Sequence, residues 1–493
     1  MPSPQSPSVL RSPRLWIGTG VIVAVVSTLF ALLYVGGNVN PKGHLRDLPV
    51  ALVNSDRGAD AGGKHVNLGD RVVDGVKKSA ADDDSIDWQV LSKAEADKRL
   101  GQGKVYGALV VPRDFTAAVT GLTAPPQTGA QSQKQDGAAQ RKDDAAAQRK
   151  GSAAAPQKGA AAPQKAPARP TLTVLTNQAA GSFGSSMASK ATQQAAHAAS
   201  AQIGKELLQR AGEQSAQGGQ AGQGGHKGQH AQGGQAQEKG SAAQRAPLAP
   251  ATQLMLADPV SVQVADGHPL GTHSAMGLSA FYYALVLLVC GMLAANVINS
   301  QVDTALGYLH ADFGPFRRRN PLQHTSRVRT LAVNGALMLG LSVVMGSLVE
   351  LASVGVLGMD ASHLGLLWLY SVATIAVVGL SALALLAAFG TPGMLVSTIV
   401  FVAMAVPSSG ATVPLEALPG FFRWLAEFEP LRQLTGGMRA ILYFDAQGDA
   451  GLTRAWVSMG VALVVSVLFG LGVTRFYDRK GLHRVPRPAA SGS

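Results

Sequence analysis

Six long apolar segments constrain this chain of 493 residues more than any other feature of its sequence. None of the six contains Asp, Glu, Lys or Arg. Each is long enough to cross the ~30 Å hydrocarbon core of a bilayer as a helix, which takes about 20 residues. The segments are 15–35, 278–298, 330–349, 364–389, 394–413 and 455–474. The sequence therefore predicts a multi-pass α-helical membrane protein with six transmembrane helices, one followed at a distance by five.

Two of the six segments have local features of their own. Arg11 and Arg14 precede segment 15–35 as they would a cleaved signal peptide. Its apolar run is longer than the roughly 7–15 residues of a signal peptide core, so we expect a retained span. Segment 394–413 carries Pro407 and the run Ser408-Ser409-Gly410, which predict a kink or an early end of its helix.

Basic residues indicate which side of the membrane each loop faces, because Lys and Arg are retained in the cytoplasm. They flank the spans at Arg11, Arg14, Arg317, Arg318, Arg319, Arg327, Arg329, Arg475, Arg479, Lys480, Arg484 and Arg487. We therefore expect both termini in the cytoplasm. The predicted parts are a cytoplasmic amino terminus (1–14), a first transmembrane helix (15–37), an extracytoplasmic domain (38–277), a five-helix membrane domain (278–476) and a cytoplasmic tail (477–493).

The extracytoplasmic domain begins with alternating strand-like and helix-like segments, which predict a small α/β layer. Strands are expected at 50–53, 86–91, 105–111 and 171–175, and helices at 66–78, at 93–100 behind the capping residues Ser92 and Glu95, and at 182–209. Two tracts, 123–170 and 211–250, consist mainly of Ala, Gln, Lys and Gly. They cannot bury enough apolar surface to offset their ordering entropy, so we expect them to be disordered.

Composition and motifs exclude several classes of function. The net charge of +12 could indicate nucleic-acid binding, but the basic residues are spread over the low-complexity tracts and the span ends, so we expect no nucleic-acid partner. The lone cysteine, Cys290, rules out an intrachain disulfide and a cysteine-based metal site. His226 and His230 have a metal-pair spacing within a glycine-rich stretch that cannot hold it on a helix.

No GxxxxGK[ST], HExxH or CxxC motif occurs in the sequence. We therefore expect no ATP site, cofactor or metal of this chain's own, and no enzyme activity. Asn54, Asp56 and Asp60 could mimic a cation loop, but Asx residues next to Gly58 are more typical of a turn. The six segments also lack the Asp, Glu or His of a proton relay, which disfavours a proton-coupled exporter.

Two loops of the membrane domain have distinctive patterns. Loop 299–329 has a helical start and combines Asp303, Tyr308 and Phe313 with the cluster Arg317, Arg318 and Arg319. The arginines predict an anchor beside anionic headgroups, and the whole loop could dock a soluble partner that supplies energy.

The second loop has apolar residues at intervals of three or four, namely Leu415, Leu418, Phe422, Leu425, Phe428 and Leu431. This spacing predicts a helix with one apolar face in the outer headgroup region. Pro414, Pro419 and Pro430 divide it, and Gly436-Gly437 allow a reversal. We therefore expect an interfacial or re-entrant hairpin that also carries Arg439.

Four stretches together resemble a known family. They are "LPVALVNSDRGADAGG", "GQGKVYGALVVPRDFTAAV", "LADPVSVQVADGHPLGTHSAMGLSAFYYALVLLVCGML" and "PLEALPGFFRWLAEFEPLRQLTGGMRAIL". The chain resembles the phage infection protein (YhgE/Pip) family, which is similar to the membrane subunits of ABC-2 type exporters. The resemblance marks Asn54, Asp56 and Gly58 as part of a shared outer-domain motif.

The resemblance implies a permease-like subunit in a bacterial cell membrane that exports a lipid, cell-wall precursor, peptide or drug. Such a subunit would form a homodimer or heterodimer and work with a separate ATP-binding subunit that docks on loop 299–329. The alternative is a surface receptor or scaffold that transports nothing and serves a phage or a secretion machine.

Overall fold

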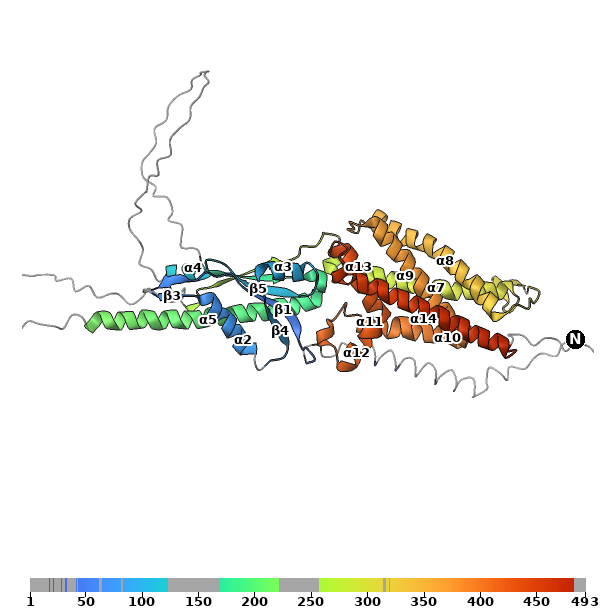
Figure 1. Cartoon of the computed structure of the whole chain (residues 1–493), viewed down its shortest axis with the longest axis horizontal. Coiled ribbons are helices and arrows are strands. Elements are labelled where there is room, and N and C mark those ends of the chain that lie inside the picture. The colour runs from blue at the N-terminus through green and yellow to red at the C-terminus, as the bar shows by residue number, and fades with distance from the viewer. Residues whose placement is uncertain are drawn as a thin grey trace, which may run out of the picture.

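The computed structural model describes residues 41, 43–61, 64–80, 83–122, 169–220, 257–313, 316–318 and 320–482, and the single residues 17, 21, 28 and 32. These residues form two parts, an α/β domain and a bundle of apolar helices, which lie end to end along the long axis of the molecule (Figure 1). We call the end of the bundle that meets the α/β domain the domain end, and the opposite end the far end.

The α/β domain is built on a mixed five-stranded sheet with the order β4-β1-β5-β6-β7. β1 pairs parallel with β4 and β5, β5 pairs antiparallel with β6, and β6 pairs parallel with β7. The strands are β1 (Leu48–Asn54), β4 (Ile86–Val90), β5 (Gly107–Val111), β6 (Thr171–Thr176) and β7 (Ser261–Asp266), and a small hairpin joins β2 (Ala59–Ala61) to β3 (Lys64–Val66).

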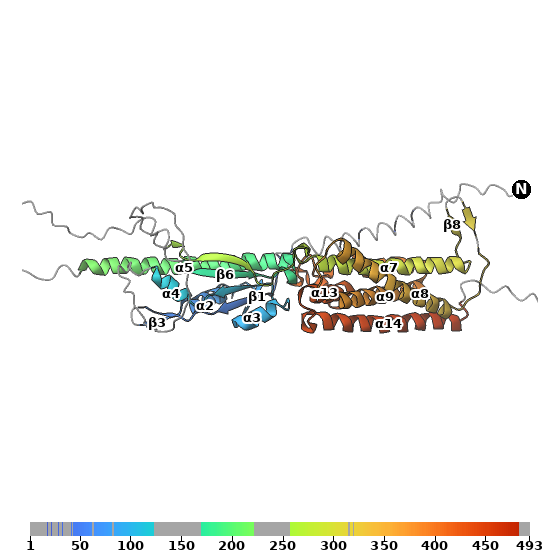
Figure 2. The ribbon, with the colours of Figure 1, turned by 90° about the horizontal axis from the view of Figure 1, so that it is seen from above.

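Helices cover both faces of this sheet. α2 (Leu68–Ala80), α4 (Phe115–Gly121) and the long α5 (Ser182–Gln220) pack on one face, and α3 (Lys93–Leu100) packs on the other. Alternate residues of β1 point to opposite faces of the sheet. Leu52 belongs to the hydrophobic core under α2 and α5, whereas Ala51 and Val53 belong to the core under α3. Figure 2 shows α5 running along the whole domain toward the bundle.

Sequence patterns predict most of this domain correctly. Four of the five sheet strands and all three predicted helices are present, and the Ser92 hydroxyl accepts a hydrogen bond from the Glu95 N–H at 3.2 Å to cap α3. Strand β7 was not predicted, and α5 reaches Gln220 instead of ending near residue 209. The rest of the two tracts predicted to be disordered lies outside the described residues, apart from residues 169 and 170.

Five described helices are long and apolar enough to cross a membrane. They are Ser279–Ala305 (α7), Arg327–Val356 (α8, Arg327–Glu350, and a π-helical turn), Leu364–Phe389 (α9), Thr391–Ser408 and Leu452–Arg479 (α14). Half of the apolar window is buried in α7 and α9, against 17% in α8 and α14. α7 and α9 are therefore central, and α8 and α14 expose apolar side chains on the flanks. The predicted first span, 15–35, lies outside the described residues except for four of its positions.

The span that contains Pro407 is irregular, as its sequence predicts. It consists of α10 (Thr391–Thr398), a π-helical turn (Ile399–Ala403) and α11 (Ala405–Ser408). Proline lacks the N–H of a helical hydrogen bond and its ring disturbs the preceding turn. The helix ends at Ser408, and Gly410 then takes a left-handed backbone with φ +68°.

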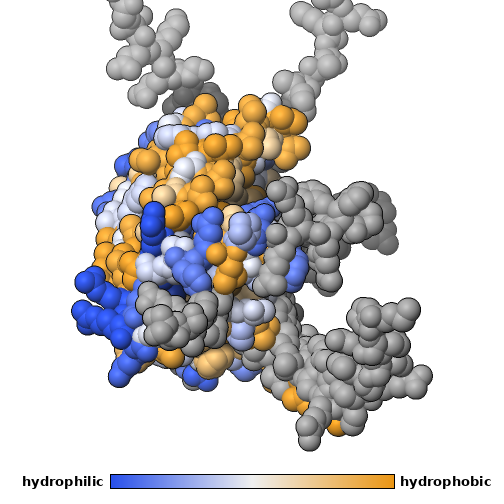
Figure 3. Space-filling model, turned by 90° about the vertical axis from the view of Figure 1, so that its right-hand side faces the viewer, coloured by the Kyte–Doolittle hydropathy of each residue, from blue (hydrophilic) through white to orange (hydrophobic). Residues whose placement is uncertain are grey.

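The far end of the bundle differs in part from the prediction for loop 299–329. α7 continues to Ala305, and Gly307 then turns the chain with φ +78°, so the helical start predicted for the stretch VDTALGYLHADFG (302–314) is wrong beyond Ala305. A hairpin of β8 (Ala311–Phe313) and β9 (Phe316–Arg318) follows. Figure 3 looks onto this end, where hydrophilic residues gather at the lower left and centre and hydrophobic ones cover the flank above.

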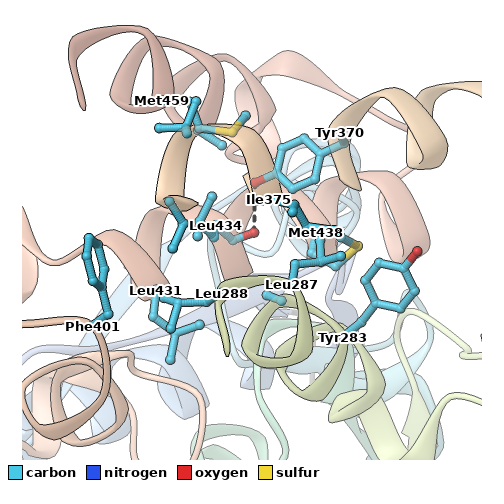
Figure 4. Packing of buried hydrophobic residues seen from close by; sticks show 14 of the residues in the cluster. Tyr283, Leu287, Leu288, Tyr370, Ile375, Phe401, Leu431, Leu434, Met438 and Met459 are labelled. Carbon is cyan, nitrogen blue, oxygen red and sulfur yellow. Dashed lines mark hydrogen bonds between the residues drawn. The ribbon is translucent and has the colours of Figure 1, made fainter. Parts of the chain in front are cut away.

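Two further helices, α12 (Gly420–Phe428) and α13 (Pro430–Tyr443), pack at the domain end. The predicted reversal at Gly436-Gly437 is wrong, because both glycines lie inside α13. A Cβ on Gly437 would lie 2.4 Å from the Tyr370 hydroxyl and 2.5 Å from the Ala455 Cβ. The glycine thus lets α13 approach α9 and α14 closely, and the Tyr370 hydroxyl donates a hydrogen bond to the Leu434 carbonyl at 2.9 Å (Figure 4).

We expect G437A to destabilise the bundle by about 1–3 kcal/mol, because the added methyl group overpacks a filled interface. G436A is the matched control, since a Cβ on Gly436 meets nothing within 4 Å. Replacing glycine by alanine inside a helix should there be neutral or stabilising by up to about 1 kcal/mol. Thermal unfolding in detergent measures both. Equal melting temperatures for the two variants would contradict the close approach.

Candidate functional site

Three prolines start the pieces of chain that form the domain end of the bundle. Pro414 precedes a 3₁₀ turn (Leu415–Ala417), Pro419 precedes α12, and Pro430 is the first residue of α13. Proline suits a first helical position because its φ is preset and the N–H it lacks has no acceptor there. The backbone therefore turns where the sequence places these residues.

Glu429 caps α13 from inside the protein. Its Oε1 accepts a hydrogen bond from the Leu431 N–H at 2.6 Å, and its Oε2 accepts one from the Arg432 N–H at 2.7 Å. The residue is only 3% exposed. Burial raises the pKa of this carboxyl to about 8, although the two N–H donors act in the opposite direction.

α12 has a buried face and an aromatic face. Phe422, Leu425 and Ala426 are buried against the bundle. Phe421, Trp424 and Phe428 are 57%, 59% and 69% exposed, and the Trp424 and Phe428 rings lie 5.6 Å apart. Exposed Trp and Phe on a short amphipathic helix are typical of the boundary between lipid and water. The predicted apolar face is therefore wrong in detail, because Leu418, Phe422, Leu425 and Leu431 pack inside the protein and only Phe428 of that face is strongly exposed.

An apolar groove of about 390 Å³ lies beside α12, between α9, α13 and α14. The turn from α12 to α13 forms part of its wall through Glu427, Phe428 and Pro430. The remaining lining residues are Thr374, Val377, Val378, Ser381, Phe401, Gln433, Leu434, Val457, Ser458, Met459, Val461, Ala462 and Val465. The groove therefore joins the apolar middle of the bundle to a polar turn at its domain end.

Hydrogen bonds already occupy the polar side chains of the groove. The Gln433 amide donates to the Glu427 carbonyl at 3.1 Å, and the Ser458 hydroxyl donates to the Arg454 carbonyl at 2.8 Å. The Ser381 hydroxyl lies 2.7 Å from the Ser466 hydroxyl. The groove thus presents a mainly apolar wall, with the exposed Glu427 carboxylate at one end, which is complementary to an amphipathic molecule.

A polar junction connects the domain end to the α/β domain. The Arg46 N–H donates to the Glu416 carbonyl at 2.8 Å, and the Tyr106 hydroxyl donates to the Glu416 carboxylate at 3.3 Å. The His268 Nε2 lies 2.7 Å from the Tyr443 carbonyl oxygen. Burial raises the pKa of both Glu416 and Tyr106. These contacts join segments far apart in the chain and position the domain on the bundle.

Arg439 lies in this junction and not on a free hairpin surface. Its Nε and Nη2 atoms are fully buried and have no hydrogen-bond partner among the described residues. Burial lowers the pKa of this guanidinium. Its Nη2 lies 3.6 Å from the position that a Cβ on Gly181 would take, so it reaches the segment that leads into α5.

Asn54, Asp56 and Gly58 are brought together after β1, as a turn. The Asp56 carboxylate accepts hydrogen bonds from the N–H groups of Gly58 (3.3 Å), Gly69 (3.0 Å) and Thr116 (3.2 Å), and one from the Thr116 hydroxyl. Asn54 accepts from the Asp56 N–H at 3.0 Å. Gly58 has φ +71°, which favours glycine. The turn joins β1 to α2 and α4, which agrees with the turn interpretation.

The residues predicted to couple the chain to a partner lie at the far end. Asp303 is 9% exposed and accepts a hydrogen bond from the Asn299 amide at 3.3 Å. The Tyr308 hydroxyl donates to the Gln323 carbonyl at 2.9 Å. The Tyr308 side chain therefore connects two parts of the loop, whereas the hydrogen bond of Asp303 lies within α7. Phe313 lies in β8 and Arg317 and Arg318 lie in β9, whereas Arg319 lies outside the described residues.

Two segments of the chain, 19–140 and 146–462, match the family described as "Protein of unknown function (DUF3533)". The chain belongs to this family. Neither a curated protein nor a solved structure matches the chain. The DUF3533 match covers the whole described part of the α/β domain and ends inside α14, so the groove, the aromatic face of α12 and the polar junction lie in it or at its border.

Sequence reasoning did not find the groove, the cap at Glu429 or the buried state of Arg439. The groove forms between helices that are distant in the chain, and no local spacing indicates it. The cap had a usable signal, because an acidic residue followed by proline at the first helical position is a helix start. Within the described ranges, no group of three His, Cys, Asp or Glu side chains is placed to hold a metal ion.

We expect E429A to destabilise the protein by about 1–2 kcal/mol, the cost of a lost helix cap. E429Q keeps a side-chain oxygen that can accept a hydrogen bond, so it should lose less stability than E429A. Because burial raises the folded-state pKa of Glu429 above its unfolded value, its stabilising contribution is full below pH ~4.5 and falls as the pH rises toward about 8. The stability of the wild type should therefore decline relative to E429Q over this window. Thermal unfolding from pH 4.5 to 8.5 measures the difference, and a pH-independent difference would contradict the raised pKa.

Proposed function

We propose that this chain is the membrane subunit of an exporter for an amphipathic, lipid-like molecule, driven by a separate ATPase. The cargo class follows from the groove between α9, α13 and α14, which is the single observation that carries the proposal. Its apolar wall accepts a hydrocarbon chain, and the turn from α12 to α13 offers polar atoms to a headgroup. Lipids, lipid-linked cell-wall precursors and apolar drugs share this chemistry.

The position of the groove supports a lateral path for the cargo. α14 is one of the two flanking helices, and Val457 and Val461 on its groove side are 60% and 58% exposed. A molecule in the surrounding lipid could therefore reach the groove without passing through water. The aromatic face of α12 lies beside it at the level expected for the lipid–water boundary.

The difference between the two ends of the bundle supports outward transport. In the proposed arrangement the far end, with Arg317 and Arg318 in β9, faces the cytoplasm of a bacterial cell, and the α/β domain lies outside. The ATPase would be a separate subunit, because this chain contains no GxxxxGK[ST] loop. It would act at the far end, because ATP is in the cytoplasm. We further propose that two such subunits pair, which is how a single groove could become part of a closed path.

We expect A462F to reduce transport about tenfold, equivalent to ~1.4 kcal/mol in the barrier, by filling the groove. V467F, on the same helix but outside the groove lining, is the matched control and should retain transport. The assay follows a fluorescent phospholipid in proteoliposomes with the co-purified ATPase and ATP. Translocation by the wild type no faster than in protein-free liposomes would contradict export and favour the receptor or scaffold alternative.

We expect R317Q/R318Q to lose the co-purified ATPase while inserting normally, if the hairpin is the docking surface. R423Q, which removes an arginine at the domain end, is the control and should keep the ATPase. Mass spectrometry of the purified complex identifies the ATPase by its GxxxxGK[ST] sequence, and accessibility of a carboxyl-terminal tag reports orientation. Inverted insertion of the double variant with the ATPase still bound would show that the arginines only anchor the loop.

A further inference from the structure

Arg439 is partly exposed as a residue, but two of its three guanidinium nitrogens are buried and have no partner in the described part of the chain. Its Nε and Nη2 atoms are inaccessible to solvent and make no hydrogen bond there. Burying a guanidinium in this way is costly unless an anion or several acceptors replace the lost water. A charge of this kind in the folded protein therefore indicates a missing counter-group.

The amino-terminal end of α5 lies against this guanidinium. Gly181 ends a 3₁₀ turn (Gln178–Ala180) with φ +147°, and α5 begins at the next residue. A Cβ on Gly181 would lie 3.6 Å from Arg439 Nη2 and 3.6 Å from Tyr106 Cε1. The guanidinium and the Tyr106 ring therefore flank the start of the helix, and Figure 2 shows this end of α5 facing α13.

The start of a helix is itself electropositive. The first N–H groups of α5 have no acceptor within the helix, and the aligned peptide dipoles place about half a positive charge at this end. Arg439 adds a full positive charge beside them. Two positive groups held together in a buried place repel each other, and an anion between them removes the repulsion and satisfies the free donors.

The two tyrosines that interact electrostatically with Arg439, Tyr106 and Tyr443, already make hydrogen bonds to other groups. The Tyr106 hydroxyl donates a hydrogen bond to the Glu416 carboxylate at 3.3 Å. The Tyr443 hydroxyl lies 2.7 Å from the Ser279 hydroxyl and accepts from the Ala280 N–H at 3.1 Å. The lowered pKa of Arg439 agrees with the absence of a compensating carboxylate. The described residues thus place two positive groups side by side and supply no acceptor between them.

We propose that Arg439 and the first turn of α5 bind a phosphate group at the junction of the α/β domain and the bundle. The planar guanidinium and the backbone N–H groups are the donors that phosphate oxygens accept in proteins. The phosphate belongs either to a lipid headgroup, given the aromatic face of α12 at the same end of the bundle, or to a soluble phosphate. This binding does not depend on the chain being an exporter.

The test uses the purified, delipidated full chain in an uncharged detergent and measures its melting temperature. Sodium phosphate is compared with sodium chloride of equal ionic strength, and phosphatidic acid is compared with diacylglycerol, which lacks only the phosphate. The variants are R439M, which removes the charge but keeps much of the volume, and R439K, which keeps the charge but loses the planar fork. R454Q, an exposed arginine at the same end, is the matched control.

We expect at least one phosphate compound to raise the wild-type melting temperature by about 3 °C or more over its matched compound. A rise with phosphatidic acid alone identifies a headgroup, and a rise with sodium phosphate identifies a soluble ligand. R454Q should keep the rise, R439K should keep part of it, and R439M should lose it while melting higher than the wild type without ligand. No rise in the wild type with either compound, or a full rise in R439M, would overturn the proposal.

Discussion

The contact of α13 with α9 and α14 at Gly437 is the interaction on which the rest of the structure depends. With no side chain there, the Tyr370 hydroxyl reaches the Leu434 carbonyl, and the Ala455 methyl group of α14 packs against bare backbone. Helices in lipid gain little from the hydrophobic effect and associate through close packing and buried hydrogen bonds. α13 is therefore held by its fit, although it is too short to span a bilayer.

The side chains of α13 face three different regions, namely the core of the bundle, the groove and the α/β domain. Leu431, Met438 and Ile441 join the core of the bundle, whereas Gln433 and Leu434 line the groove. Arg439 points to the α/β domain. A change in the position of α13 would alter the groove and the junction together, because one rigid helix of 14 residues carries both. One helix thus connects the α/β domain to the groove.

How much the sequence reveals depends on whether the determining contacts are local. Apolarity alone locates the four long helices α7, α8, α9 and α14, and periodicity locates β1, α2 and α3, because burial leaves its pattern within each segment. Strand β7 escapes because it is an edge strand after a long low-complexity tract, and its pairing with β6 joins residues about 90 apart. The glycine pair inside α13 is misread as a turn for the same reason, since the tyrosine that explains it lies on another helix. The groove and the junction consist entirely of such distant contacts.

The two ionisable side chains near the ends of α13, Glu429 and Arg439, differ in whether their own helix satisfies them. Glu429 lies at the amino-terminal end, where two N–H groups of its own helix donate hydrogen bonds to its carboxyl oxygens. Arg439 stands one turn before the carboxyl-terminal end, where the helix dipole favours a cation. Its side chain extends away from that end and reaches the start of α5, where the dipole has the opposite sign. The hydrogen bonds of Glu429 are therefore satisfied within the fold, whereas the Arg439 guanidinium lies beside the electropositive start of α5. Only a group with negative charge can satisfy both, and the described part of the chain provides none at that point.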